Sequence, residues 1–330
     1  MKGIVYTQFG APDVLEIMEV PMPTPADNQV LIKVKASSMY NMDYMRFAKQ
    51  VDGGETPLST RLIDTAQKAI GKVIGSELSG IVETVGKEVK NIKKGDEVFA
   101  VASGLSGALA EYALADISTV CLKPSNLSFE EAATIPIAGI SALGAIRKAQ
   151  VRTGQTVLIY GASGGVGQFA VLLAKAVGAT VTAVCSTRNI QIARSIGADY
   201  VIDYKRDNFT KMGKTYDVII AVNGYNPLGE YKKLLNNGGV YVAVGGMKQG
   251  IMGGIFGSFY SNKSKKLTSS TYFDAIKQEC LPYLKDLAEE GKLKPYVEKV
   301  YSTKDITNAI KELCKNHAQG KIAFIMDLGE

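Results

Sequence analysis

The stretch TVLIYGASGGVG at residues 156–167 constrains the fold of this 330-residue chain more than any other. It begins with Val157, Leu158 and Ile159, an aliphatic run typical of a strand buried on both faces of a sheet. A glycine-rich turn opens at Gly161, and apolar residues then recur at helical spacing in QFAVLLAKAVG. In such a strand–turn–helix unit, pyrophosphate oxygens contact backbone N–H groups at the helix N-terminus, where a Cβ would keep them away. The sequence therefore predicts a dinucleotide-binding βαβ unit.

The glycine turn departs from the G-x-G-x-x-G fingerprint at one position. When the motif is aligned on its last glycine, the first glycine is replaced by Ala162. A glycine-rich turn without a ligand is the alternative, but the strand before it and the helix after it favour a binding site. The residues expected to contact the cofactor here are Ala162, Ser163, Gly164, Gly165, Val166 and Gly167.

The end of the next predicted strand indicates which dinucleotide binds. VTAVC at residues 181–185 is followed by Ser186, Thr187 and Arg188, so no Asp or Glu is in place to accept a hydrogen bond from a ribose 2′-hydroxyl. Ser186 and Arg188 suit a 2′-phosphate, and we therefore expect NADPH rather than NADH. The alternative for Arg188 is a solvated arginine at the start of a helix.

Composition and charge argue against several classes of protein. The net charge of +6 is spread along the chain, and its one dense lysine cluster, at residues 263–266, fits a solvated loop. Neither nucleic acid nor a membrane surface is therefore an expected partner. The four cysteines form no C-x-x-C and there is a single histidine, His317, so no metal site is expected. No apolar run reaches membrane-spanning length and no signal peptide is recognisable, which favours a cytoplasmic protein.

The order of the predicted elements indicates an α/β chain with two domains. Residues 1–120 hold short alternating segments between Pro, Gly and Asn turns, a pattern typical of a distorted β-barrel. A Ser-x-x-Glu capping box at Ser128 and Glu131 opens a helix. From Thr156 on, strands and helices alternate as in a doubly wound Rossmann domain with a parallel sheet. We predict a barrel domain at residues 1–123 and 266–330, and a Rossmann domain at residues 124–265.

Six short motifs, in order along the chain, resemble those of one family. They are GSELSGIV at 75–82, GDEVF at 95–99, GALAEY at 107–112, EAATIP at 131–136, GADYVIDY at 197–204 and GKI at 320–322. With the glycine turn they make the chain similar, nearly end to end, to the medium-chain dehydrogenase/reductase superfamily, and within it to the zinc-free quinone oxidoreductase and enone reductase branch. The resemblance implies a GroES-like barrel domain beside the Rossmann domain. It also implies a homodimer that pairs the last sheet strands, either GGVYVAVGG at 238–246 or the strand just after it.

The chain differs from the zinc alcohol dehydrogenases of this superfamily at the metal site. Those enzymes carry a Cys three residues before an Asp, and a His in the first motif. Here the Asp is Asp43, and the Cys and His positions are occupied by Tyr40 and Ser76. Neither is a credible zinc ligand, so we expect no metal. Without a Lewis acid, conjugate reduction is the easier chemistry, because hydrogen-bond donors can hold the charge that spreads onto the carbonyl oxygen.

The stretch around Asp43 supplies the donors expected to act in catalysis: Tyr40, Asn41 and Tyr44. Packing in the core is the alternative for both tyrosines. By the resemblance, Ser141 matches a hydroxyl residue near the nicotinamide and Tyr204 matches a tyrosine beside the adenosine phosphate.

The sequence thus predicts a zinc-independent oxidoreductase that transfers hydride from NADPH to a quinone or an α,β-unsaturated carbonyl. The alternative is an NADPH-binding sensor or structural protein without significant turnover, because a binding motif alone does not establish catalysis.

Overall fold

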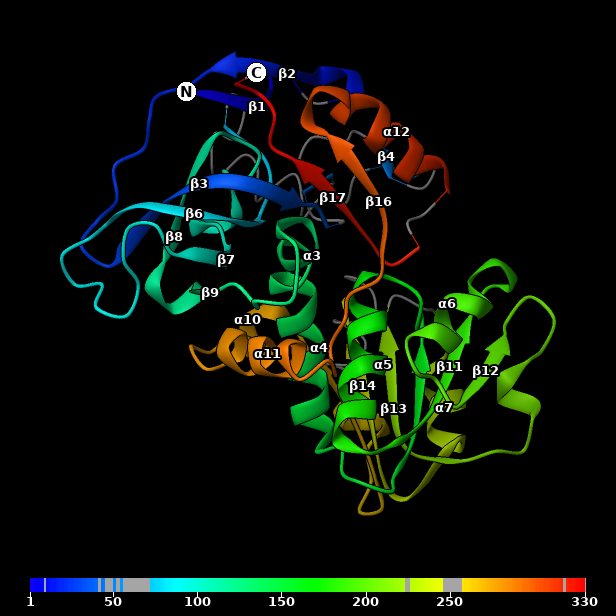
Figure 1. Cartoon of the computed structure of the whole chain (residues 1–330). Coiled ribbons are helices and arrows are strands. Elements are labelled where there is room, and N and C mark those ends of the chain that lie inside the picture. Colours follow the sequence, from blue (N-terminus) through cyan, green and yellow to red (C-terminus); the bar gives the residue numbers. More distant parts are fainter. Residues whose placement is uncertain are drawn as a thin grey trace. The chain divides into compact units, whose positions relative to one another are not determined.

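The computed structural model describes residues 1–8, 10–40, 43–44, 50–51, 54–55, 72–222, 226–245, 257–316 and 319–329 (Figure 1). The chain divides into a first unit, Met1–Ile137 with Val297–Glu330, and a second unit, Ala138–Tyr296. These boundaries differ from the predicted ones at residues 123 and 266. None of the helices in the described ranges has the length and apolar character needed to cross a membrane.

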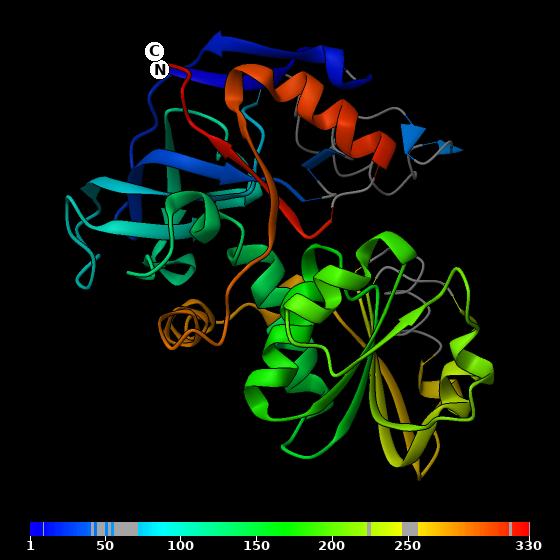
Figure 2. The same ribbon diagram turned by 45° about the vertical axis from the view of Figure 1, so that its right-hand side comes forward.

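The first unit is built on a curved sheet with the strand order β16-β17-β3-β6-β7-β9, in which β8 also pairs with β3. The last strand, β17, lies antiparallel to β3, so the C-terminal segment joins the sheet begun near the N-terminus. In Figure 2, the orange α12 lies beside the red β17. The elements are β1 (Lys2–Tyr6), β2 (Leu15–Glu19), β3 (Gln29–Ser38), β6 (Glu77–Val85), β7 (Glu97–Val101), β8 (Tyr112–Asp116), β9 (Val120–Leu122), α3 (Phe129–Ala133), β16 (Val297–Ser302), α12 (Ile306–Asn316) and β17 (Lys321–Ile325). The remaining pieces described here are two-residue strands, β4 (Gln50–Val51) and β5 (Gly54–Glu55), and short 3-10 turns.

Alternation of buried and exposed side chains explains why β3 forms a strand with one face in the core. In β3, Ile32 and Val34 are buried whereas Lys33 and Lys35 are exposed, as a strand with one face in the core requires. Ile32 and Val34 belong to a cluster that includes Leu78 of β6.

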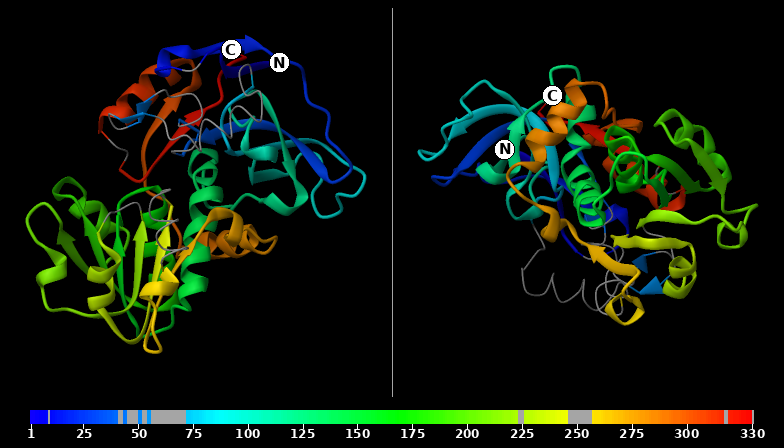
Figure 3. Two further views of the ribbon diagram at one scale, coloured as in Figure 1. Left: turned by 180° about the vertical axis from the view of Figure 1, so that it is seen from behind. Right: turned by 90° about the horizontal axis from the view of Figure 1, so that it is seen from below.

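The second unit is a parallel sheet with the strand order β12-β11-β10-β13-β14-β15. Figure 3 shows its strands from behind, coloured from green to gold. Leu158 and Ile219, register partners on β10 and β13, share a buried cluster with Tyr231 of α7. The elements are α4 (Pro136–Ala149), β10 (Thr156–Tyr160), α5 (Gly165–Val177), β11 (Thr180–Cys185), α6 (Ile190–Ser195), β12 (Tyr200–Asp203), β13 (Tyr216–Val222), α7 (Leu228–Lys233), β14 (Leu235–Val244), α9 (Gly257–Tyr260), β15 (Lys265–Ser270), α10 (Tyr272–Ala275) and α11 (Cys280–Glu289).

Two packing interactions explain the shifted boundaries. The capping box of Ser128 and Glu131 is confirmed at the start of α3, and Ser79 of β6 donates to the Phe129 carbonyl at 2.5 Å, which fixes α3 to the barrel. At the other boundary, β15 pairs in parallel with β14, so it belongs to the Rossmann sheet and not to the barrel as predicted. Helix α11 also lies in the second unit.

Candidate functional site

The tight turn after β10 is made by Gly161. Its φ is +75°, and a Cβ at this position would lie 2.1 Å from the Val222 carbonyl oxygen. A side chain is therefore excluded both by backbone conformation and by contact. In the G-x-G-x-x-G alignment, the first glycine, which makes the tight turn, corresponds to Ala162. In the structure Ala162 is a buried residue inside the turn. Sequence reasoning missed Gly161 as a site residue, although a glycine directly after a buried strand was the available signal.

Gly164 has a different reason to be glycine. It is the N-cap of α5 with φ −84° and ψ 177°, a conformation open to any residue. Among the described residues, the nearest atom to a Cβ built there is the Gly161 carbonyl oxygen at 3.5 Å, an ordinary contact. The fold alone does not demand a glycine at this position. The missing side chain leaves space directly above the turn, as the approach of a pyrophosphate to the backbone requires.

The first turn of α5 can bind an anion. No side chain caps the helix, and the N–H groups of Gly165, Val166 and Gly167 lie before the first residue that can bond within the helix. These groups and the helix dipole favour a phosphate. A Cβ at Gly167 would lie 2.0 Å from the Gly161 oxygen, so this last glycine allows the helix to pack closely on the turn. The predicted turn residues are thus brought together at the N-terminus of α5, and we call Ser163–Gly167 the cradle.

The predicted 2′-phosphate residues lie at the carboxyl edge of the same sheet. Cys185 of β11 and Asp203 of β12 are register partners, and the Tyr204 N–H donates to the Cys185 carbonyl at 3.1 Å. Ser186 and Arg188 follow the first strand and Tyr204 follows the second, so the fold brings the ends of both segments together. The Tyr204 ring is partly exposed and stacks on Tyr160 at 6.1 Å.

Two further cations at this edge were missed by sequence reasoning. Lys205 lies 5.5 Å from the Tyr204 ring centre, and Arg206 lies 3.7 Å from the Asp203 carboxylate. The hydrogen bond from Thr187 is the main cause that lowers the pKa of Asp203, so this carboxylate is charged at neutral pH. The GADYVIDY motif drew attention to Tyr204, and the two basic residues directly after it were the signal.

Cys185 lies close to this edge but is not a nucleophile. Burial, with a further contribution from the charge of Asp203, raises the pKa of its thiol to about 11. The thiol therefore stays protonated at neutral pH and packs as a small apolar side chain.

The donors predicted for catalysis lie in the first unit. Tyr40 follows the end of β3 and is half-buried, and Asn41 lies outside the described residues. Tyr44 is partly buried against the core cluster that contains Ile4 and Phe324, a contact that favours the packing alternative for this residue. The remaining predicted residue, Ser141, lies on α4 and is buried.

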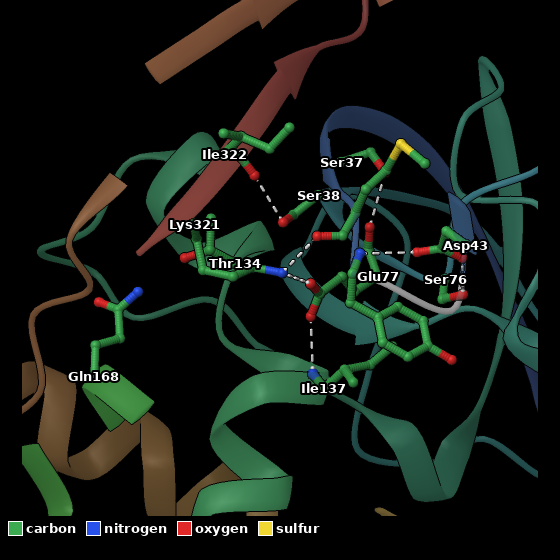
Figure 4. A network of polar contacts seen from close by, with 12 residues as sticks. Ser37, Ser38, Asp43, Ser76, Glu77, Thr134, Ile137, Gln168, Lys321 and Ile322 are labelled. Atoms are coloured by element: carbon green, nitrogen blue, oxygen red, sulfur yellow. Dashed lines mark hydrogen bonds and ion pairs between the residues drawn. The ribbon is translucent and has the colours of Figure 1, made fainter. Parts of the chain in front are cut away.

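Charged side chains hold the backbone of Tyr40. Its N–H donates to Asp43 Oδ2 at 3.1 Å, and the carbonyl of the preceding Met39 accepts from Lys321 Nζ at 2.9 Å. Because these two groups belong to the same peptide unit, that peptide is held at both of its polar ends (Figure 4). Sequence reasoning did not assign a role to Lys321, although the GKI motif contains it.

Lys321 is itself held by a buried acid. It forms an ion pair with Glu77, and the other carboxylate oxygen of Glu77 accepts from the Ile137 N–H at 2.9 Å (Figure 4). The side chains of Lys321 and Glu77 are 4 % and 0 % exposed, so the pair is shielded from solvent. We call Tyr40, Asp43, Glu77 and Lys321, with the Met39 carbonyl, the Tyr40 network.

The residues at the zinc position do not fit zinc. The Ser76 hydroxyl donates to the buried Asp43 carboxylate and lies 2.8 Å from the Leu105 carbonyl oxygen, so it is engaged within the protein. Neither a serine hydroxyl nor Tyr40 supplies the thiolate or imidazole that zinc prefers. Within the described ranges, no three His, Cys, Asp or Glu side chains come together in a way that could hold a metal ion.

Comparison with known proteins finds relatives that match nearly the whole of this chain. Residues 26–125 match the family described as "Alcohol dehydrogenase GroES-like domain", and residues 196–323 match "Zinc-binding dehydrogenase". The chain is 31% identical over 334 residues to quinone-oxidoreductase QR1, chloroplastic, of Triphysaria versicolor, covering 98% of this chain and 97% of the relative. It is also 31% identical over 334 residues to the NADPH-dependent alkenal/one oxidoreductase, chloroplastic, of Arabidopsis thaliana, covering 98% and 78%. Among solved structures, the quinone oxidoreductase from Coxiella burnetii superposes with a TM-score of 0.84 at 30% identity, covering 98% of this chain and 99% of that one.

Proposed function

The chain belongs to the medium-chain dehydrogenase/reductase superfamily, in its quinone oxidoreductase branch, and we propose that it reduces quinones or α,β-unsaturated carbonyls with NADPH and without zinc. The observation that carries the proposal is Gly164: neither its backbone conformation nor its packing requires a glycine, and the missing side chain supports the approach of a cofactor pyrophosphate to this turn. The substrate class is supported by the names of the relatives. Membership of the superfamily makes the protein an oxidoreductase with a nicotinamide cofactor.

NADPH in preference to NADH is supported by the charges at the carboxyl edge. Arg188, Lys205 and Arg206 are three cations at this edge, and β11 ends in Ser186 and Thr187 with no carboxylate of its own to repel a 2′-phosphate. The charged Asp203 carboxylate at the same edge is engaged by Thr187 and Arg206, so Arg188 and Lys205 are the cations that carry the argument. The cradle of Ser163–Gly167 would hold the pyrophosphate, and Tyr204 would cover the adenosine. When bound, NADPH supplies the hydride.

The protein must then stabilise the negative charge that develops on the substrate carbonyl oxygen. We propose that the Tyr40 hydroxyl donates a hydrogen bond to this oxygen, because a tyrosine stays protonated at neutral pH. The Tyr40 network supports this role by fixing the backbone from which the side chain extends. Asn41 stays a predicted second donor, and Tyr44 a less favoured one. Ser141 is proposed to contact the nicotinamide.

Assembly and compartment are part of the same proposal. Strand β15 is the last strand of the parallel sheet, and among the described residues β14 is its one strand partner, so we propose a homodimer in which the other side of β15 pairs with a two-fold mate. Among the described residues, Cys121, Cys185 and Cys280 form no disulfide, and thiols that stay reduced are typical of the cytoplasm that we propose. Light scattering that finds a monomer at micromolar concentration would contradict the dimer.

Steady-state kinetics test the proposal. The loss of NADPH absorbance should follow saturation kinetics with a simple quinone and with an alkenal, and prolonged treatment with a chelator should leave both rates unchanged. NADPH binding without turnover of either substrate would instead favour the sensor alternative. A rate that falls on chelation and returns with zinc would refute the zinc-free assignment.

A further inference from the structure

Asn189 follows β11 and makes a hydrogen bond that its position does not explain. It is the N-cap residue of α6, and asparagine is one of the preferred caps because its side chain can accept from the first N–H groups of a helix. Here the side chain makes no cap hydrogen bond. It reaches instead to the glycine turn, where Nδ2 donates to Ser163 Oγ at 2.7 Å.

The other end of the same amide is left without a partner. Asn189 is 8 % exposed, and its Oδ1 atom is buried with no hydrogen-bond partner among the described residues. A buried acceptor without a donor is unfavourable for the folded state, and native proteins contain few of them. Helix capping therefore does not account for this side chain, and the unpaired Oδ1 atom offsets part of what its hydrogen bond to Ser163 contributes to stability.

The contact decides what the Ser163 hydroxyl can do. A serine oxygen can accept or donate, but here its acceptor side already receives the Asn189 N–H. Among the described residues, the Ser163 hydroxyl donates no hydrogen bond. Ser163 directly precedes Gly164, the N-cap of α5, so it belongs to the cradle proposed for the pyrophosphate.

We propose that Asn189 is a positioning residue for the cofactor, which commits the Ser163 hydroxyl to donate to a pyrophosphate oxygen. A hydroxyl that accepts from an amide becomes a better donor, because hydrogen bonds in a chain polarise one another. Asn189 is neutral, so it orients Ser163 without the charge that would repel a phosphate. The inference deepens the proposed function and rests on it.

Four variants test the role by titration with NADPH and with NADH. Asn189→Leu keeps a similar shape but frees the Ser163 hydroxyl to rotate, and we expect both cofactors to bind about fivefold more weakly. Asn189→Asp turns the neighbour into an acceptor that captures the Ser163 hydrogen, so a loss of about tenfold or more is expected for both. Ser163→Ala should lose about tenfold. The double variant Ser163→Ala/Asn189→Leu should bind no more weakly than Ser163→Ala, because Asn189 acts through Ser163.

Thermal unfolding of the free protein separates positioning from stability. Asn189→Leu removes the unpaired acceptor as well as the hydrogen bond, so its Tm should not fall below that of the wild type. Asn208→Leu is the matched control, because Asn208 does cap its helix through the Thr210 N–H at 3.0 Å. This control should lower the Tm and leave both dissociation constants unchanged.

The result that overturns the inference is wild-type affinity for both cofactors in Asn189→Leu and Asn189→Asp. A lower Tm for Asn189→Leu, with additive losses in the double variant, would also overturn it and make the contact structural. If the wild-type protein binds neither NADPH nor NADH, the proposed function fails and this inference falls with it. If the wild type binds and the Asn189 variants bind equally well, only the inference fails.

Discussion

The glycine turn of the second unit and the Tyr40 network of the first are built in opposite ways. The turn is local: its parts lie within residues 161–167, and its chemistry comes from backbone N–H groups and missing side chains. The Tyr40 network joins residues as far apart as Met39 and Lys321 through buried charged side chains. A site formed by backbone groups can be recognised from a short sequence motif. A site formed by side chains distant in the sequence comes together only when the sheet has assembled. The two should therefore respond differently to substitution.

The largest effect is expected at the buried ion pair. Lys321→Met leaves Glu77 buried without its counter-charge, which should cost about 3–5 kcal/mol of unfolding free energy. The double variant Lys321→Met/Glu77→Gln should recover most of this loss, since a glutamine side chain is neutral and could still accept from the Ile137 N–H. Urea unfolding of the wild type and the two variants measures the difference. A single variant as stable as the wild type would show that the network does not hold the barrel together.

The next effect concerns turnover. Tyr40→Phe removes the proposed donor to the carbonyl oxygen and should slow alkenal reduction by a factor of about 10²–10³, or ~2.7–4 kcal/mol in activation free energy. NADPH affinity should stay near the wild-type value, and quinones, which are reduced more easily, should be affected less. Tyr44→Phe tests the less favoured donor by the same change, and we expect a small effect because Tyr44 packs against the core. Full alkenal turnover in Tyr40→Phe would reduce Tyr40 to a packing residue.

Gly161 and Gly164 test the comparison within the turn itself. The fold requires a glycine at the first position, whereas at the second we propose that only cofactor binding requires one. Gly161→Ala forces a Cβ against the Val222 carbonyl at positive φ and should cost roughly 2–3 kcal/mol of stability. Gly164→Ala meets only an ordinary contact, so its Tm should be close to that of the wild type while NADPH binds at least about tenfold more weakly. Thermal unfolding and a binding titration on both variants decide the matter. Equal loss of stability in the two would remove the distinction.

Features set by neighbouring residues could be predicted from the sequence, whereas features that join distant residues could not. The strand–turn–helix unit, the capping box and the alternation of strands and helices are set by neighbours in the chain, and they are present in the structure. The domain boundaries differ because β15 is a short, polar strand whose assignment depends on its pairing with β14. Lys321 and Glu77 received no role, since neither spacing nor periodicity links residues 244 positions apart. Gly161 was missed for another reason: the fingerprint alignment assigned its role to the next residue.

The smallest expected effect is on the preference for NADPH over NADH, at the edge where β11 and β12 end. This edge combines residues from a local motif with residues brought there by strand pairing. Arg188 was found from a local pattern, whereas Lys205 and Arg206 reach the same edge only because Cys185 and Asp203 are register partners. If the local pattern decides cofactor choice, Arg188→Ala should remove most of an approximately tenfold preference for NADPH over NADH, and Lys205→Ala should change it little. Dissociation constants for both cofactors, measured at low and at high salt, distinguish a direct contact from a diffuse charge effect, because a diffuse effect is screened by salt. If the two variants lose equal parts of the preference, the edge acts through its summed charge, and the strand pairing matters for cofactor choice as much as the motif.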